Sequence, residues 1–368
     1  MRLALVVPGG VDRSGEYRVI PALLALIKRL AVHNDVQVFA LHQEAQACSW
    51  DLAGVRVHNI GVRHTYLRAV RTICATSRSC PLDLVHAIWS GPCGLVAVVT
   101  AKILGIPSVI HVGGGELAAL PEIGYGGRLR WQGRVREAVV LRAASAITAA
   151  SAPVVKTLSG LGLAAQRVPL GVDLNTWPPR EPVRRRSVEP ARLIHVASLN
   201  RVKDQSTLLR ALAALVAAGL SFEMDIVGED TLQGEMQALA AQLGLSQKVR
   251  FRGFLTQRQL RPLMEAAHLL VMSSRHETGP LAMLEAAAAG VPTVGTAVGH
   301  LAEWAPSAAI SVPVGNWAAL AESVGKLLND EERRLRIAHE ALRRATREDA
   351  DYTGRQFQAL YESLTATK

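Results

Sequence analysis

Glu277 and Glu285 are separated by seven residues, most of which form an apolar helical pattern. Alanine and leucine favour a helix, Pro280 suits its first position, and Gly290 with Pro292 predicts its end. Glu285 then lies inside a helix that is apolar on all sides, which is typical of a helix in the protein interior. An ionised carboxylate is costly there unless a partner binds it. That partner is either a buried Arg or Lys, or a ligand that donates hydrogen bonds.

Two cations form a second candidate site. Arg201 and Lys203 lie between a strand expected at residues 193–197 and a helix expected at residues 206–217. Arg can bind a diphosphate through its planar fork, and Lys can bind it as a point charge. Ligands of open parallel sheets collect beyond the carboxyl ends of the strands, so these cations predict an anion site.

A glycine-rich turn follows the first expected strand. Gly10, Ser14 and Gly15 precede an amphipathic helix expected at residues 19–30. Glycine lets a backbone approach a ligand, and a helix N-terminus favours an anion. The spacing is not Gly-x-Gly-x-x-Gly, which disfavours a nicotinamide dinucleotide. An ordinary strand-to-helix turn stays open as the alternative.

A second glycine-rich loop spans residues 113–116, and a further glycine cluster surrounds Tyr125. Three successive glycines cost conformational entropy, which indicates a ligand-facing loop. Arg130 and Arg134 follow one turn apart on a basic helix. That helix is either a solvated face or a contact for an acidic acceptor or for lipid headgroups.

The composition is that of a two-domain globular protein. The chain has 368 residues, of which 49% are hydrophobic and 20% are charged. This length suits two domains of roughly 150 to 180 residues each. No apolar run reaches the roughly 18 residues of a membrane span, and residues 3–7 are too short a run for a signal peptide. We therefore expect a cytoplasmic protein, with its basic helix as a contact to the inner face of the membrane.

The net charge of +10 leaves several anionic partners open. Arginines concentrate in residues 128–136, 184–186 and 333–347, and such clusters are usually solvated faces. No nucleic-acid motif accompanies them and only 4% of the residues are aromatic, so we expect no nucleic-acid binding. The four cysteines show no metal-ligand pattern, so no metal site and no cofactor are expected.

Short β-branched runs alternate with longer Ala/Leu helical patterns, which is typical of parallel sheets covered on both faces. Strands are expected at residues 3–7, 36–41, 55–60, 84–88, 108–112 and 146–150, and again at 193–197, 222–227, 249–253, 269–273, 293–296 and 310–314. This predicts an α/β protein with two Rossmann-like domains, residues 1–175 and 187–349, which face each other across a cleft. The Pro- and Arg-rich residues 176–186 are expected to link them.

Taken in chain order, these segments resemble the retaining GT-B glycosyltransferases that carry a Glu-x7-Glu signature (glycosyltransferase family 4, glycosyl transferases group 1). The resemblance covers nearly the whole chain and is strongest at residues 197–209, 226–229, 249–253 and 273–303. It implies the GT-B fold. It also implies a C-terminal helix, near residues 350–368, that packs back on the first domain.

The resemblance also implies roles for the motifs. Glu277 would approach the hydroxyls of the transferred sugar, and Glu285 would accept hydrogen bonds from the nucleotide ribose. Lys203 and Arg201 would bind the diphosphate together with helix N-terminal amides. Further donor contacts would come from Ser198, Gly228, Gly253, Gly279, Pro280, Leu281 and Ala282. In the first domain the candidates are Gly10, Ser14, Gly15, His111, Gly113, Gly114 and Glu116, with Tyr125, Arg130 and Arg134 toward the acceptor or membrane.

Two positions depart from the family pattern. The arginine that accompanies Lys203 in the family would fall at Ser198, and we expect Arg201 to compensate. The family histidine near the donor sugar would fall at Gly113, which leaves His111 or Glu116 to supply that contact.

The reaction implied by the resemblance is transfer of a sugar from a nucleoside diphosphate sugar to an acceptor hydroxyl, with retained anomeric configuration and no obligatory metal. The acceptor would be a lipid-linked or anionic glycan, in glycan, glycolipid or polysaccharide biosynthesis. A nucleotide-sugar epimerase of GT-B architecture and a non-catalytic nucleotide-sugar-binding protein stay open as alternatives. A nicotinamide oxidoreductase is disfavoured by the glycine spacing.

Overall fold

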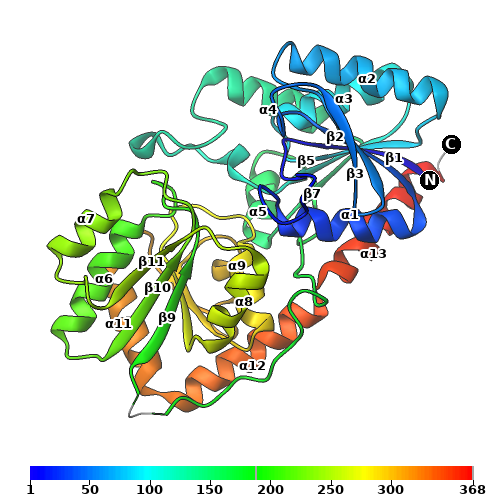
Figure 1. The fold of residues 1–368 in the computed structure, drawn as a ribbon. Helices are drawn as coiled ribbons and strands as arrows, with labels where there is room; N and C mark the ends of the chain where they lie inside the picture. The colour runs from blue at the N-terminus through cyan, green and yellow to red at the C-terminus, as the bar shows by residue number, and fades with distance from the viewer. Residues whose placement is uncertain (187–188, 367–368) are drawn as a thin grey trace. The chain divides into compact units, whose positions relative to one another are not determined.

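The computed structural model describes residues 1–186 and 189–366. The chain divides into two compact units, which Figure 1 shows as ribbons. Unit 1 comprises Met1–Gly171 and Ala350–Lys368, and unit 2 comprises Val172–Asp349. Each unit has its own sheet with helices on both faces, which confirms the predicted α/β fold class.

Within the described residues, unit 1 contains an eight-stranded sheet with the order β3-β4-β2-β1-β5-β6-β7-β8. Its strands are β1 (Arg2–Val7), β2 (Asp35–Ala40), β3 (Cys48–Leu52), β4 (Val55–Asn59), β5 (Leu84–Ile88), β6 (Ser108–Val112), β7 (Ala146–Ala149) and β8 (Gln166–Arg167). Its helices are α1 (Pro21–His33), α2 (Thr65–Ser79), α3 (Pro92–Leu104), η1 (Gly115–Leu117), η2 (Pro121–Ile123), α4 (Trp131–Ala143), α5 (Ala152–Gly160) and α13 (Ala350–Thr365). The strands pair in parallel, except that β3 runs antiparallel to β4.

The side chains of β1 explain why both faces of this sheet are covered. Successive residues of a strand point to opposite faces. Leu5 belongs to the cluster that contains Leu23 of α1, whereas Val6 belongs to the cluster that contains Val96 of α3. An uninterrupted apolar strand therefore buries one set of side chains under each helical layer.

Helix α13 lies beside α1 in unit 1, as Figure 1 also shows. Its buried Tyr361 places the hydroxyl 2.6 Å from Nδ1 of His86 on β5. Burial holds the pKa of His86 well below its usual value, so the ring is neutral. At the surface, Arg29 of α1 pairs with Asp351 at 2.7 Å. The last helix of the chain thus belongs to the core of the first unit.

Within the part of the chain that is described, unit 2 contains a six-stranded parallel sheet with the order β11-β10-β9-β12-β13-β14. Its strands are β9 (Ala191–Val196), β10 (Phe222–Val227), β11 (Val249–Gly253), β12 (Leu269–Met272), β13 (Thr293–Thr296) and β14 (Ile310–Val312). Its helices are α6 (Gln205–Ala217), α7 (Glu235–Gln242), α8 (Gln257–Ala266), α9 (Leu281–Ala288), α10 (Gly299–Trp304), α11 (Trp317–Asn329) and α12 (Glu331–Arg347).

Residues 176–186, which were expected to be a linker, pack on unit 2. The backbone amide of Arg185 donates to Glu331 at 2.6 Å. The fully buried Arg334 donates to the carbonyl oxygen of Val183, also at 2.6 Å. The boundary between the units accordingly lies before this segment, after Gly171.

Candidate active site

Lys203 and Glu277 form an ion pair in unit 2. Nζ of Lys203 lies 2.5 Å from Oε1 of Glu277, which also accepts a hydrogen bond from the Ser274 hydroxyl at 2.7 Å. The Ser273 hydroxyl donates to the backbone carbonyl of Lys203 at 2.8 Å. The side chains of the pair are 25% and 10% exposed, respectively. The structure therefore brings together the two side chains that the sequence assigned to the diphosphate and the sugar.

Neutral polar groups hold the loop that carries Lys203. Gln205, the first residue of α6, donates through Nε2 to the carbonyl oxygen of Ser198 at 3.1 Å and lies 3.2 Å from Nε2 of His195. Nδ1 of His195 lies 2.8 Å from the carbonyl oxygen of Val271. Burial lowers the pKa of His195 to about 4, so the neutral ring donates to Val271 and accepts from Gln205. This network positions Lys203 without adding a second charge.

Arg201 binds a different partner from Lys203. Its guanidinium makes two hydrogen bonds to Glu235, at 2.9 and 2.7 Å. Both side chains are well exposed, at 59% and 45%. A surface ion pair of this kind contributes roughly 0 to 1 kcal/mol to stability, so an anionic ligand can displace it at little cost.

Arg275 is a cation beside the Lys203 loop that the sequence analysis did not single out. Its backbone amide donates to the carbonyl oxygen of Val202 at 2.7 Å, and its Nε lies 3.1 Å from Oδ2 of Asp204. Asp204 is buried and caps α6 through the Thr207 amide. The sequence feature that could have identified Arg275 is its position two residues before Glu277.

Glu285 lies on α9 and is 3% exposed. Burial raises its pKa to about 7, and the nearby side chains of Gln257 and Trp177 counter this shift only in part. In the described residues no Arg or Lys pairs with it, so the expected alternative of a buried salt bridge is wrong. The sequence analysis missed Gln257 and Trp177, because no local pattern connects them to Glu285.

Helix α9 begins one residue later than predicted. Pro280 is the residue that precedes the helix, not its first helical residue, and Gly279 comes before it. Leu281 and Ala282 form the first turn, where backbone amides have no partner within the helix. The short helix thus presents polar amides at its N-terminus and a buried carboxylate in its interior.

Two glycines mark the carboxyl ends of neighbouring strands. Gly228 follows β10 with φ of 153°, and a Cβ there would collide with the carbonyl of Ala197. Its amide donates to the carbonyl oxygen of Gly253 at 2.9 Å. Only glycine fits such a close approach to the segment that leads to Ser198.

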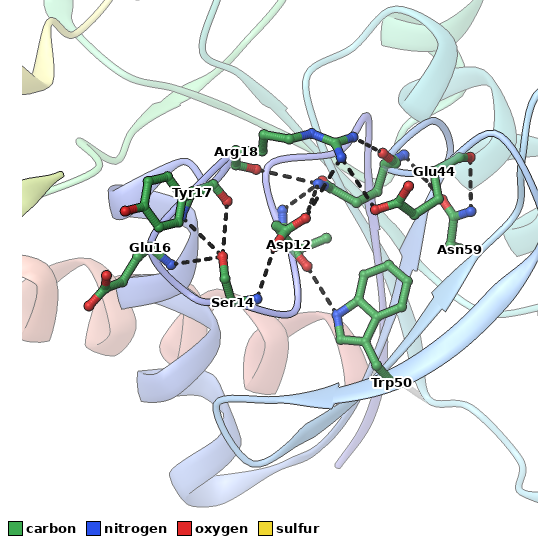
Figure 2. Close-up of polar contacts among 10 residues, drawn as sticks. Asp12, Ser14, Glu16, Tyr17, Arg18, Glu44, Trp50 and Asn59 are labelled. Carbon is green, nitrogen blue, oxygen red and sulfur yellow. Dashed lines mark hydrogen bonds and ion pairs between the residues drawn. The ribbon is translucent and has the colours of Figure 1, made fainter. Parts of the chain in front are cut away.

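The loop after β1 is fixed by side chains from other parts of unit 1, as Figure 2 shows. Asp12 accepts from the Ser14 amide at 2.9 Å, and the Trp50 indole donates to the Val11 carbonyl at 3.1 Å. The buried Gln43 accepts from the Val11 amide at 3.0 Å. These hydrogen bonds hold the loop in a defined conformation, so it is more than a simple connection to α1.

Gly10 and Gly15 of this loop both adopt positive φ, at 77° and 69°. A Cβ on Gly10 would collide with Ile20, so a side chain is excluded on steric grounds as well. The following helix α1 begins at Pro21, two residues later than predicted.

Glu116 organises the glycine loop that follows β6. Its two carboxylate oxygens accept from the Ser90 amide at 3.1 Å and from the Gly114 amide at 2.6 Å. Burial raises its pKa to about 7, helped by nearby Glu137, to which the Ser90 hydroxyl donates. Glu116 thus holds the backbone of its own loop and of the segment that follows β5.

His111 is fully buried beside Gly113. Its Nδ1 lies 2.9 Å from the Thr148 hydroxyl, and its ring packs edge-on against Phe357 of α13. Burial lowers the pKa of His111 to about 3, so the ring is neutral.

Tyr125, predicted at the acceptor or membrane, lies in the loop between η2 and α4, and the two arginines predicted with it lie at the start of α4. The Tyr125 ring packs on Gly115, where a Cβ would collide with it. Arg130 precedes α4 and Arg134 follows one turn later, and both side chains are exposed. They lie in unit 1, whereas Lys203 and Glu277 lie in unit 2.

Comparison with known proteins places this geometry in a family. Residues 180–344 match the family described as glycosyl transferases group 1, and residues 18–172 match the glycosyl transferase 4-like domain. D-inositol 3-phosphate glycosyltransferase 1 of Catenulispora acidiphila is 32% identical over 287 residues, which cover 72% of this chain and 68% of that protein. 2-Deoxystreptamine glucosyltransferase of Streptomyces kanamyceticus is 27% identical over 74% of this chain and 75% of its own length. Across the first five relatives, the match spans 42% to 76% of their length.

Solved structures give the same fold. Sucrose-phosphate synthase from Thermosynechococcus elongatus superposes with a TM-score of 0.81 at 16% identity, over 100% of both chains. Anabaena HepE, solved in complex with UDP-glucose, gives a TM-score of 0.76 at 19% identity over 99% of this chain and 100% of its own. The fold is therefore GT-B, as predicted.

The chain belongs to the glycosyl transferases group 1 family and is a glycosyltransferase. This confirms the predicted family and enzyme class. Among the described residues, no group of three or more His, Cys, Asp or Glu side chains is arranged to hold a metal ion.

Replacing Glu285 with Gln is expected to stabilise the protein at high pH. Because the pKa of the buried group is raised from 4.5 to about 7, wild-type stability falls as the pH rises through this range and Glu285 ionises. Glutamine has a similar shape and no charge. The gain should be about 3 kcal/mol near pH 8 and below about 1 kcal/mol near pH 5.

Thermal unfolding at both pH values measures this difference. Glu322→Gln, which changes an exposed carboxylate of unit 2, serves as the control. An equal effect of Glu285→Gln at the two pH values would contradict the raised pKa.

Proposed function

We propose that this glycosyltransferase moves a sugar from a nucleoside diphosphate sugar to an acceptor hydroxyl, with retention of anomeric configuration. The observation that carries the proposal is the 2.5 Å contact between Lys203 and Glu277, which lie just beyond the carboxyl ends of β9 and β12. Ligands of open parallel sheets bind at this edge. The UDP-glucose complex of HepE supports the donor class. We place the reaction in glycan, glycolipid or polysaccharide biosynthesis.

In this proposal, fixed positive groups stabilise the leaving diphosphate. Negative charge grows on the diphosphate as its bond to the sugar breaks, and preorganised cations and amides lower the barrier. Lys203 supplies one cation and exchanges Glu277 for phosphate oxygens. Arg201 supplies a second by exchanging Glu235 for phosphate. The amides of Leu281 and Ala282 at the N-terminus of α9 add partial positive charge.

The two glutamates bind hydroxyl groups in this proposal. Glu277, released from Lys203, accepts hydrogen bonds from the transferred sugar while Ser274 keeps its carboxylate oriented. Glu285 accepts from the two hydroxyls of the nucleotide ribose. Ribose hydroxyls supply the donors that a buried carboxylate without a cation requires.

The loops of unit 1 are proposed to bind the acceptor. Gly10, Ser14 and Gly15 lie in a loop that Gln43 and Trp50 hold in place. Gly113 and Gly114 have no side chains and lie in the loop that Glu116 holds. The His111 ring lies next to Gly113. Rigid loops with bare backbone suit close approach of a polar acceptor such as a glycan.

Helix α4 is proposed to bind an anionic membrane surface. Its exposed apolar residues Trp131, Val135 and Val139 are 64%, 53% and 55% exposed and recur every four residues, so they form one stripe. Exposed arginines 130, 134 and 142 accompany the stripe. Apolar and basic residues together on one helix are typical of interfacial helices. In the described residues, no helix has the length and apolar character needed to cross a membrane.

Variants of the ion pair should separate diphosphate binding from sugar binding. Lys203→Met is expected to weaken binding of both a nucleoside diphosphate and its sugar conjugate by roughly tenfold or more, because a charge-assisted contact is lost. Glu277→Gln should leave the diphosphate affinity intact and weaken only the sugar conjugate. Calorimetric titration with UDP-, GDP-, ADP- and dTDP-linked sugars and the free diphosphates measures both.

Arg201→Ala serves as the comparison for Lys203→Met. A similar loss of diphosphate affinity would support the role of Arg201 as the second cation. Equal weakening of diphosphate and sugar conjugate by Glu277→Gln would contradict the sugar role. Retention is checked in a separate experiment, in which NMR gives the anomeric configuration of the product.

Changing the apolar stripe of α4 should weaken membrane binding. The triple variant Trp131→Ser, Val135→Ser, Val139→Ser is expected to bind phosphatidylglycerol vesicles at least roughly tenfold more weakly than wild type, because several apolar side chains no longer leave water. Sedimentation with vesicles measures this. Val32→Ser on α1, whose side chain is 72% exposed, is the control. Equal binding by the triple variant and wild type would contradict the proposal.

A further inference from the structure

Trp89, which directly follows β5, has a backbone conformation that bulky residues rarely adopt. Its φ is 75°, in the left-handed region that favours glycine. Strain of this kind persists only where the surrounding structure enforces it, and it is concentrated at functional sites. Trp89 is therefore a candidate for a role in unit 1 that the site described above does not include.

Hydrogen bonds on both sides of Trp89 hold it in this conformation. Its own amide donates to the carbonyl oxygen of His111 at 2.9 Å. The next residue, Ser90, is fully buried, and its amide donates to Glu116 at 3.1 Å while its hydroxyl donates to Glu137 of α4. These contacts fix the direction of the chain and with it the place of the indole.

The Trp89 indole lies against the glycine loop that follows β6 (residues 113–115). A Cβ on Gly114 would lie 2.8 Å from both Cδ1 and Nε1 of the indole, which is too close for a side chain. A Cβ on Gly113 would lie 3.9 Å from Nε1. Glycine at position 114 therefore makes room for the ring, and glycine at position 113 places no side chain beside the indole nitrogen.

The indole N–H of Trp89 has no hydrogen-bond acceptor among the residues that the structure describes. Trp89 is half-buried, and its nitrogen is not enclosed by protein, so the N–H is open to solvent. An indole nitrogen can only donate, and a hydroxyl oxygen is a suitable acceptor for it.

Two other polar side chains near this loop are not available to a ligand in the same way. His111 is fully buried, so its unpaired Nε2 is enclosed. Both carboxylate oxygens of Glu116 accept hydrogen bonds from backbone amides. Of these three side chains, Trp89 is the one that offers an open hydrogen-bonding group.

We propose that the Trp89 indole N–H binds a hydroxyl group of a sugar acceptor. This inference rests on the acceptor role proposed above for the loops of unit 1, and it names the side chain that recognises the acceptor. A sugar ring presents hydroxyl groups at its edge and C–H groups on its faces, which suits a side chain with an apolar ring and one polar N–H. The acceptor class is therefore a hydroxylated ring.

The test uses Trp89→Phe, which keeps an apolar ring and removes the N–H. Trp317→Phe, at a tryptophan of unit 2 that is 42% exposed, is the matched control. The acceptor probes are the methyl glycosides of glucose, galactose and mannose, and the disaccharides maltose and lactose. The donor is whichever of the UDP-, GDP-, ADP- and dTDP-linked sugars binds most tightly, and product formation gives KM and kcat for each probe.

Trp89→Phe is expected to raise the KM of the best probe by roughly three- to tenfold, because one hydrogen bond is lost, and to leave donor affinity unchanged. The control should change neither. In wild-type protein with nitrogen-15 in its tryptophans, the indole signal of Trp89 is identified by its absence from Trp89→Phe. It should shift as the probe is added. A purely structural role would lower the unfolding temperature and kcat without such a shift.

A second variant tests the same contact while the indole stays in place. Gly113→Ala adds a methyl group beside the indole nitrogen, and the backbone of Gly113 is outside the left-handed region, so alanine is compatible with it. This variant should raise the KM of the probe and reduce the shift of the Trp89 signal. An unchanged KM and an unchanged shift would contradict a binding site beside Gly113.

Two failures can be told apart. If wild type forms product but Trp89→Phe has the same KM and the probe does not move the indole signal, the role of Trp89 is overturned and the proposed transfer stands. If wild type forms product with none of the probes and none of them moves the signal, the acceptor role of the unit 1 loops is contradicted as well.

Discussion

The cost of burying the Glu285 carboxylate is the constraint on which the donor side of this enzyme depends. The fold surrounds it with apolar residues of α9 and places the neutral side chains of Gln257 and Trp177 near it, and among the described residues no Arg or Lys pairs with it. The protein therefore keeps an ionisable group whose pKa lies near neutrality, at about 7. Such a site lowers the stability of the free protein, and this is expected where a buried group is kept for a ligand.

In the cationic half of the site, unlike at Glu285, the charge already has a partner of opposite sign. Lys203 is already paired with Glu277, and its loop is held by Gln205 and the neutral His195. A preformed pair keeps the two charges together and shields them until a ligand arrives. In the proposed mechanism, donor binding replaces one set of partners by another, which limits the reorganisation required during the reaction.

The sequence predicted twelve strands of the two sheets to within two residues, and strands such as β1 and β12 were found because they form unbroken apolar runs. It did not predict β3 or β8, since β3 is a polar antiparallel edge strand and β8 has two residues. Residues 176–186 looked like a linker because their ion pairs and hydrogen bonds to α12 are long-range. The glutamates were found from their spacing, whereas Trp177 and Gln257 reach Glu285 through tertiary packing that no local pattern encodes.

The most direct measurement of the central claim is the affinity for an intact nucleoside diphosphate sugar as a function of pH. An intact donor is suitable because its diphosphate does not titrate near neutrality. The account predicts that wild-type affinity rises as the pH passes through about 7, where Glu285 ionises, and levels off above it, and that Glu285→Gln binds weakly without this rise. The same pH dependence in both proteins would contradict the claim that Glu285 holds the donor.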